Sequence, residues 1–162
     1  MTHNPYGRTG NHPKIIVIHA MGEYILRDDG TNYEHAPDFL NRMKLSAHAL
    51  VTPSGEVLRL RNDDETAYHA QGFNTNSLGM EILVAGKHTY RTFTKAIDLA
   101  YVIDAQYAAA VAQCREWVEK YGITRIVRHS DLSPGRKIDP GDGFPFLEFL
   151  KDVKVTQTQE AI

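Results

Sequence analysis

The chain has one cysteine, one tryptophan and no excess of basic residues among its 162 residues. An internal disulfide needs two cysteines, so Cys114 cannot form one and we expect no disulfide framework. The 18 lysines and arginines are offset by 20 acidic residues, which gives a formal net charge of -2. A chain without a global positive field is poorly suited to binding a phosphate backbone, so we expect no nucleic-acid partner.

Long apolar stretches are also missing. No part of the sequence approaches the roughly twenty consecutive apolar residues of a membrane span, so we expect no membrane association. The first residues, MTHNPYGRTGNHPK, are polar where a secretory signal has an apolar core. Together with the unpaired cysteine, this predicts cytoplasmic synthesis without a signal peptide and folding in a reducing compartment.

Hydrophobic residues make up 42% of the chain, which is enough to build the core of one domain of this length. We expect an N-terminal segment at residues 1–13, one domain at 14–152 and a flexible tail at 153–162, where the sequence becomes polar. The sequence contains no repeat or linker that indicates a second domain, and we expect a monomer.

Short apolar runs and one long helical pattern predict an α/β fold. The predicted strands cover residues 14–20, 48–52, 56–61, 78–86 and 123–129. The predicted helices cover residues 37–45, 104–121 and 144–153, and the longest of them ends at Gly122. Strands and helices in this order predict a single domain with a central mixed β-sheet flanked by helices.

Two histidines stand at the ends of predicted strands. His19 closes the first strand, His129 closes the last, and Asp139 follows ten residues later in the loop RHSDLSPGRKIDPG. Two imidazole nitrogens and one carboxylate oxygen suit zinc, and three protein ligands leave a fourth position for water. The chain contains eight histidines, however, and any two of them can be surface or core residues. The spacing alone leaves both interpretations open.

Four blocks of sequence favour the metal site. IIVIHA, SAHALVTPSGEVLRL, AYHAQGFNTNSLGMEIL and RHSDLSPGRKIDPG, in this order, resemble the zinc-dependent N-acetylmuramoyl-L-alanine amidases of type 2. That family includes phage lysins, cell-wall recycling amidases and animal peptidoglycan recognition proteins. The resemblance covers residues 14–150, and its last block is the most specific. It implies a zinc-bearing groove along one face of the sheet and makes residues 14–152 the catalytic domain.

The resemblance also implies a role for each site residue. His19, His129 and Asp139 match the three zinc ligands of the family. Lys137 matches a lysine that stabilises charge on the substrate, and Glu81 matches the acidic proton shuttle of the recycling branch. Amide hydrolysis needs these components, because it requires an activated water, a cation near the developing oxyanion and a proton for the leaving amine.

Two of these residues have a simpler alternative. Strand alternation alone would turn Glu81 towards solvent, between two apolar neighbours. Lys137 could equally be a solubilising residue of a polar loop.

Four further polar residues lie in the matched blocks and are candidates for substrate binding: His48, His69, Asn74 and Asn76. Their side chains offer hydrogen bonds to sugar hydroxyls and peptide amides. Packing is the alternative role for the two histidines, and a solvated loop would account for the two asparagines.

The chain departs from the family pattern at three positions. Many members carry a catalytic tyrosine where this chain has Ala47, which shifts the proton handling to Glu81. Ala20 and Met21 replace a polar pair that often follows the first ligand, so we expect a more apolar groove beside it.

Residues 86–106 match nothing in the pattern. Tyr90, Arg91 and Phe93 in this segment either contact substrate or pack within a loop.

The resemblance therefore implies hydrolysis of the amide between the lactyl group of N-acetylmuramic acid and L-alanine in peptidoglycan or a muropeptide. A bacteriolytic phage endolysin, which reaches the cell wall after the membrane is breached, is favoured by the short chain and the departures beside His19. The alternatives are a cytoplasmic amidase that recycles anhydro-muropeptides, an enzyme for another amide of the stem peptide, and a non-catalytic peptidoglycan-binding module. The presence of all three ligands favours an enzyme over a binding module.

Overall fold

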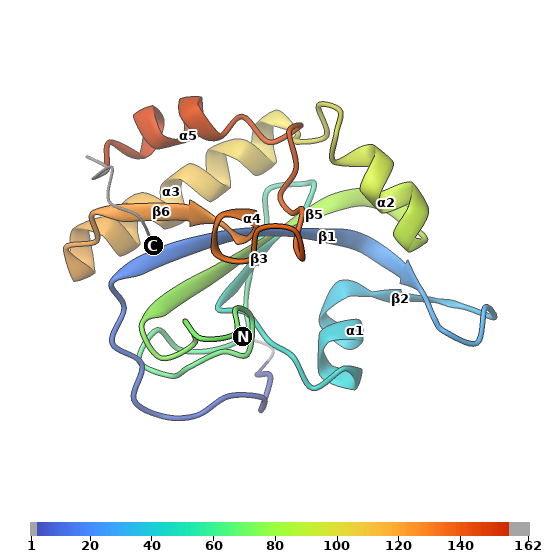
Figure 1. Ribbon diagram of the computed structural model, residues 1–162, viewed down its shortest axis with the longest axis horizontal. Helices are drawn as coiled ribbons and strands as arrows, with labels where there is room; N and C mark the ends of the chain where they lie inside the picture. Colours follow the sequence, from blue (N-terminus) through green and yellow to red (C-terminus); the bar gives the residue numbers. More distant parts are fainter. Residues whose placement is uncertain (1–2, 156–162) are drawn as a thin grey trace.

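Strand β1 (Ile15–Leu26) is the central strand of the sheet in the computed structural model, which describes residues 3–155 (Figure 1). It pairs in parallel with β5 (Ser77–His88) on one edge and with β6 (Arg125–Arg128) on the other. The short strand β2 (Tyr33–His35) pairs antiparallel with the last residues of β1.

Two further strands extend the sheet beyond β5. Strand β3 (Ala49–Val51) runs parallel to β5, and β4 (Val57–Arg59) runs antiparallel to β3. The described residues thus form one six-stranded sheet of mixed direction, which confirms the predicted fold class.

Both faces of β1 are covered, as its β-branched run predicts. Residues 16–21 are all buried. Ile16 and Ile18 belong to the main core, whereas Met21 belongs to a second cluster on the other face. Because side chains alternate along a strand, His19 lies on the same face as Met21.

The main core lies under α3 (Asp104–Tyr121) and α5 (Phe146–Val153), which cover one face of the sheet in Figure 1. Cys114 and Trp117 of α3 are fully buried there. Helix α3 ends at Gly122 with a left-handed φ of 62°, so the predicted long helix and its glycine cap are confirmed.

Helix α1 (Ala36–Arg42) covers only part of the opposite face. Its residues Ala36 and Leu40 pack on Met21 and Leu83. The face beside α1 is bordered by α2 (Tyr90–Ala96) and by the loop that follows α4 (His129–Leu132). This part of the sheet carries the groove described below.

Several elements differ from the predicted ones. β1 and β5 both run beyond their predicted ends and pair out to Ile25 and His88, past a bulge after Gly22. Helix α2 occupies part of the segment that matched no family pattern, and it begins at a capping box of Thr89 with Thr92. The short elements β2 and α4 were not predicted.

The ends of the described chain are attached to the domain. The side-chain amide of Asn4 donates to the Leu45 carbonyl at 2.9 Å, and that of Asn11 donates to the Asp63 and Ser77 carbonyls, both at 2.9 Å. The predicted tail began at residue 153, but Val153 ends α5 and packs in the main core. The remainder of that prediction, residues 156–162, lies outside the described residues.

No helix within residues 3–155 combines the length and hydrophobicity that crossing a membrane requires.

Candidate active site

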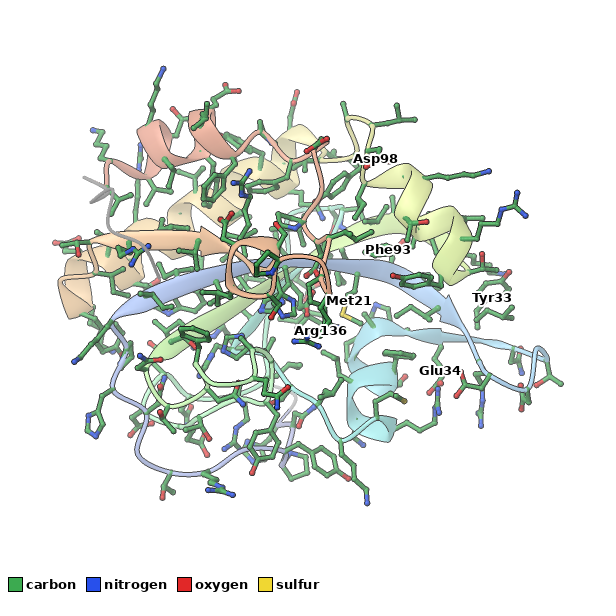
Figure 2. The ribbon with its side chains drawn as sticks, viewed as in Figure 1. Met21, Tyr33, Glu34, Phe93, Asp98 and Arg136 are labelled. Atoms are coloured by element: carbon green, nitrogen blue, oxygen red, sulfur yellow. The ribbon has the colours of Figure 1, made fainter. Side chains whose placement is uncertain are left out.

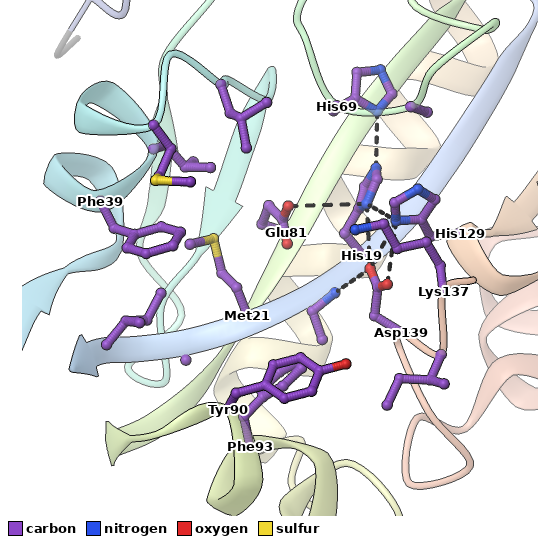
Figure 3. Close-up of a pocket in the computed structure, with 18 of the residues that line it drawn as sticks. His19, Met21, Phe39, His69, Glu81, Tyr90, Phe93, His129, Lys137 and Asp139 are labelled. Carbon is purple, nitrogen blue, oxygen red and sulfur yellow. Dashed lines mark hydrogen bonds and ion pairs between the residues drawn. The ribbon is translucent and has the colours of Figure 1, made fainter. Parts of the chain in front are cut away.

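The structure brings His19, His129 and Asp139 together where β6 ends beside the middle of β1 (Figure 3). Ile18 pairs with Arg128 in the parallel ladder, so the residues that follow them, His19 and His129, lie side by side. Their Nδ1 atoms are 3.0 Å apart. Asp139 Oδ2 lies 3.3 Å from His19 Nδ1 and 3.2 Å from His129 Nδ1.

All three side chains are buried, with exposed fractions of 2% for His19, 6% for His129 and 9% for Asp139. Burial lowers the pKa of His19, which favours a neutral imidazole. Burial alone would raise the pKa of Asp139, but hydrogen bonds with His129 and His19 outweigh it and hold the pKa below its usual value. The cluster therefore favours a carboxylate beside neutral imidazole, the forms in which these groups bind metals.

This donor set fits a zinc ion. The candidate ligand atoms of the three residues all lie within 4.8 Å of one another. The Nδ1 atoms of the two histidines face each other at 3.0 Å, and a carboxylate oxygen of Asp139 lies within 3.3 Å of both, so the three donor atoms converge on one point. Two imidazoles and one carboxylate are a zinc-binding set that leaves a coordination position open.

The loop that carries Asp139 is held by hydrogen bonds on both sides of it. Ser130 N donates to the Asp139 carbonyl at 3.0 Å, and Lys137 N donates to the Ser133 carbonyl at 3.0 Å. The Tyr101 hydroxyl donates to the Pro140 carbonyl at 2.8 Å. The carboxylate is thus fixed by its backbone rather than by the cluster alone.

Glu81 lies next to the cluster because it is the partner of His19 in the ladder between β1 and β5. Its side chain faces the groove, and the residue is 8% exposed, so the solvent-facing alternative is wrong. Oε1 lies 4.0 Å from His19 Nδ1, whereas Oε2 is buried without a hydrogen-bond partner in the described part of the chain. Burial, followed by the charge of Asp139, raises the pKa of Glu81 well above its ordinary value.

Lys137 also lines the groove. Figure 3 shows its side chain extending from the loop towards the cluster of His19 and His129. Its positive charge lowers the pKa of both His19 and Glu81, although burial is the larger effect on each. A lysine in this position does not behave as a solubilising residue of an exposed turn.

Of the four predicted substrate-binding residues, two line the groove and two do not. His69 and Asn74 line the groove. His69 Nδ1 is 2.9 Å from His19 Nε2, so this histidine contacts a candidate ligand directly. Asn74 Oδ1 accepts hydrogen bonds from the backbone N–H groups of His69 and Ala70 and thereby fastens the loop.

The predictions for His48 and Asn76 need correction, because neither residue lines the groove. His48 is fully buried, where its Nδ1 accepts from Gly79 N at 3.0 Å and its Nε2 lies 2.7 Å from the Glu65 carbonyl. The packing alternative therefore holds for His48. Asn76 lies just before β5, and its carbonyl accepts from Lys14 N, where β1 and β5 begin.

The groove has a volume of about 680 Å³ and continues from the cluster over an apolar area. Figure 2 shows Met21, Phe93 and Arg136 around it. The larger apolar side chains of its lining come from β1, α1, α2, the segment after α1 and the loop before Asp139: Met21, Ile25, Leu26, Phe39, Leu40, Met43, Leu45, Tyr90, Phe93 and Ile138. The apolar groove expected beside His19 is therefore present, and two of the three unassigned side chains of α2 face it.

Two residues of the site were not predicted. Ser77 Oγ lies 2.9 Å from His69 Nε2, behind the cluster. Tyr101 supports the Asp139 loop, and burial raises its pKa above the ordinary value. Ser77 precedes the first apolar residue of β5, and Tyr101 precedes α3, so neither stands out by pattern.

Comparison with known proteins agrees with this geometry. Residues 9–142 match the family described as N-acetylmuramoyl-L-alanine amidase. The 1,6-anhydro-N-acetylmuramyl-L-alanine amidase AmpD of Haemophilus influenzae is 33% identical over 121 residues, which cover 70% of this chain and 61% of the relative. AmpD of Escherichia coli is 32% identical over 117 residues, which cover 66% and 57% respectively. The chain thus spans about three-fifths of the length of these curated relatives.

Solved structures share the fold. The N-acetylmuramoyl-L-alanine amidase LysC from Clostridium intestinale aligns with a TM-score of 0.72 and 21% identity, over 96% of this chain and 95% of that protein. AmiD from E. coli, solved with the substrate anhydro-N-acetylmuramic acid-L-Ala-D-gamma-Glu-L-Lys, aligns with a TM-score of 0.69 and 22% identity, over 94% and 62%.

Proposed function

Because the chain belongs to the N-acetylmuramoyl-L-alanine amidase family, we propose that it hydrolyses the amide between the lactyl group of N-acetylmuramic acid and L-alanine, with zinc as its cofactor. The convergence of His19, His129 and Asp139 beside the buried carboxyl of Glu81, at the end of a groove, carries this proposal. The three ligand residues would hold the zinc. When bound, zinc supplies a Lewis acid that polarises a carbonyl and lowers the pKa of a water to about 7.

Glu81 carries the proton in this reaction. It accepts a proton from the attacking water as the water oxygen bonds to the lactyl carbonyl carbon. It then gives that proton to the alanine nitrogen as the carbon–nitrogen bond breaks. A carboxyl whose pKa burial raises well above its ordinary value is a stronger proton acceptor than an exposed glutamate, which suits a group that takes a proton from water and passes it on.

Lys137 stabilises the negative charge that develops on the carbonyl oxygen. Its loop is held by backbone hydrogen bonds, so the ammonium needs little reorganisation when that charge appears. Loss of a single preorganised donor of this kind costs about a hundred- to thousandfold in rate in other hydrolases.

The groove takes the remainder of the substrate. Its polar end holds the scissile amide, and the apolar side chains of β1, α1 and α2 contact uncharged parts of the muropeptide.

Two biological roles fit this chemistry. An endolysin, which acts on the intact wall, is supported by the fold shared with the endolysin LysCS from Clostridium intestinale, which aligns with a TM-score of 0.72 and 23% identity. A recycling amidase, which acts on soluble anhydro-muropeptides, is the second candidate, because curated relatives with 30–33% identity are named 1,6-anhydro-N-acetylmuramyl-L-alanine amidases.

The test is to incubate the purified protein with intact peptidoglycan and, separately, with a soluble anhydro-muropeptide. Each reaction is run with and without a zinc chelator, and the products are identified by mass spectrometry. We expect chelator-sensitive release of free stem peptide, and the preferred substrate separates the two roles. Binding of either substrate by zinc-loaded protein without cleavage would refute the amidase and indicate a recognition module.

A further inference from the structure

Two side chains, His69 and Ser77, extend a chain of hydrogen bonds from His19 into the interior of the protein. His19 Nε2 lies 2.9 Å from His69 Nδ1, and His69 Nε2 lies 2.9 Å from Ser77 Oγ. The Ser77 hydroxyl is 2.6 Å from the Phe73 carbonyl. The three side chains and this carbonyl form one chain of hydrogen bonds, which ends on a backbone group of fixed character.

The direction of every hydrogen in this chain follows from its last member. A carbonyl only accepts, so the single hydrogen of the Ser77 hydroxyl is donated to Phe73. The hydroxyl oxygen must then accept from His69 Nε2, which leaves the Nδ1 of a neutral His69 without a hydrogen. His19 Nε2 must therefore donate to His69 Nδ1, and the Nδ1 of a neutral His19 keeps its lone pair.

A neutral His69 satisfies this chain of hydrogen bonds, because its Nε2 faces the hydroxyl of Ser77 and its Nδ1 faces the imidazole of His19. Neither of these two contacts is made by a carboxylate, so neither favours a second hydrogen on the ring.

The ring of His69 is also held in place by close packing against β5. A side chain at Gly79 would place its Cβ 2.6 Å from His69 Nδ1, so the ring occupies the space that a larger residue would fill. The His48 ring lies on the same part of β5, where its Nδ1 accepts from Gly79 N at 3.0 Å. It meets the His69 ring edge-on at 5.9 Å but belongs to a separate set of hydrogen bonds.

We propose that His69 and Ser77 are positioning residues, which hold His19 with its hydrogen on Nε2 and so present Nδ1 to the metal. Without them, Asp139 at 3.3 Å would draw the hydrogen of His19 to Nδ1, the atom that must bind zinc. Partners of this kind orient metal-bound histidines, and their removal typically costs about 10- to 100-fold in metal affinity. The proposal rests on the proposed function only in taking zinc as the metal.

The first test measures the zinc affinity of metal-free protein by competition with a chromophoric chelator. We expect two variants to weaken zinc binding about 10- to 100-fold. His69→Leu has no acceptor for the hydrogen of His19, and Ser77→Ala no longer fixes the hydrogen of His69 on Nε2. His69→Asn should restore part of the affinity, because its Oδ1 can stand in for Nδ1 as the acceptor.

His48→Gln is the matched control, since it alters a buried histidine beside Gly79 without touching His19. We expect it to lower stability while the zinc affinity stays within about threefold of wild type. An equal loss of affinity in the control would mean that general packing, rather than the hydrogen-bond chain, sets the affinity, and would overturn the proposal.

The second test needs no variant. Nitrogen-15 NMR of the histidine rings in metal-free wild-type protein at pH 7.5 should show His19 with its hydrogen on Nε2, even though a carboxylate lies beside Nδ1. A hydrogen on Nδ1 of His19, or unchanged zinc affinity in folded His69→Leu, would disprove the positioning role of His69 and Ser77. Both measurements are independent of hydrolysis, so they distinguish failure of this inference from failure of the amidase proposal.

Discussion

At the scale of single residues, Glu81 combines two features that seldom occur together. It is buried, and its Oε2 atom has no hydrogen-bond partner among residues 3–155. A carboxyl oxygen left in this state costs free energy of folding, which is understandable where the group must exchange protons with a substrate.

We predict that Glu81→Gln abolishes hydrolysis and keeps the metal. A glutamine of the same shape cannot carry the proton, so kcat should fall by about 10²- to 10⁴-fold, the range for loss of a general acid–base group. Product release followed by mass spectrometry, with zinc content measured in the same samples, checks this. Glu56→Gln removes the same charge at an exposed position and should leave the rate of hydrolysis and the zinc content unchanged. Full activity in Glu81→Gln would show that another group carries the proton.

His48 predicts a pH dependence of stability. Its pKa is lowered from 6.5 to about 4, mainly by burial. Between these pH values the unfolded chain binds a proton that the folded protein does not, so the free energy of unfolding rises with pH. The contribution, about 3 kcal/mol, is fully present above pH 6.5 and is lost as the pH falls towards 4.

Urea unfolding of wild type and His48→Gln at several pH values tests this. The variant should lose stability less steeply between pH 6.5 and 4, because glutamine does not titrate. Parallel curves for the two proteins would show that His48 titrates alike in both states.

The sequence predicted the three candidate ligands that the structure brings together, whereas it did not predict the burial of the residues beside them. His19 and His129 end apolar strands, and the family resemblance supplied Asp139. Alternation predicts the face of a strand but not what covers that face, so Glu81 could be taken as solvent-facing and His48 as part of the groove. Both are buried: the ring of His48 contacts Glu65 and Gly79, and Glu81 lies beside His19 of the neighbouring strand.

At the scale of elements, Gln106 joins α3 to the sheet. Its amide nitrogen donates to the Val51 carbonyl at 2.9 Å and to the Leu83 carbonyl at 2.7 Å, and the side chain is fully buried. The helix thereby connects to β3 and β5, the strand that carries Glu81.

We predict that Gln106→Leu lowers the free energy of unfolding by about 2–3 kcal/mol, because it removes hydrogen bonds to two buried carbonyls. Gln113→Leu is the matched control on the same helix. Its amide nitrogen is buried without a partner in the described chain, so its replacement should be neutral or stabilising. Urea unfolding of both variants measures these changes. Equal losses of unfolding free energy in the two variants would contradict the role given to Gln106.

Element prediction succeeded where the pattern was long or strongly apolar and failed where tertiary contacts decide. The apolar spacing of α3 and its terminal Gly122 are local signals. Helix α2 has no buried residue, so it lacks an apolar stripe, and its start depends on the pairing of Thr89 with Thr92. Strand β2 has only three residues and exists through its pairing with β1.

At the scale of the whole molecule, the three candidate zinc ligands come from segments that are distant in sequence. Zinc held by them in the folded state alone would stabilise the entire domain. At a free zinc concentration 100 times the dissociation constant, the gain is about 2.7 kcal/mol, which corresponds to roughly 5–10 °C in melting temperature for a domain of this size.

Thermal unfolding of metal-free protein with and without added zinc measures this gain. Asp139→Ala should abolish the shift, because two imidazoles alone bind zinc more weakly. A shift that persists in Asp139→Ala would place the metal elsewhere in the protein.

The central position of β1 also constrains how the protein is made. β1 leaves the ribosome before its parallel partner β6, which begins at Arg125, and before the candidate ligand Asp139. Nascent β1 therefore remains an unpaired apolar strand on the β6 side until β6 has been synthesised. Parallel pairing over such separations is slow and leaves apolar edges exposed meanwhile. We expect a dependence on chaperones during translation, and no high-affinity zinc binding by nascent chains that end before residue 139.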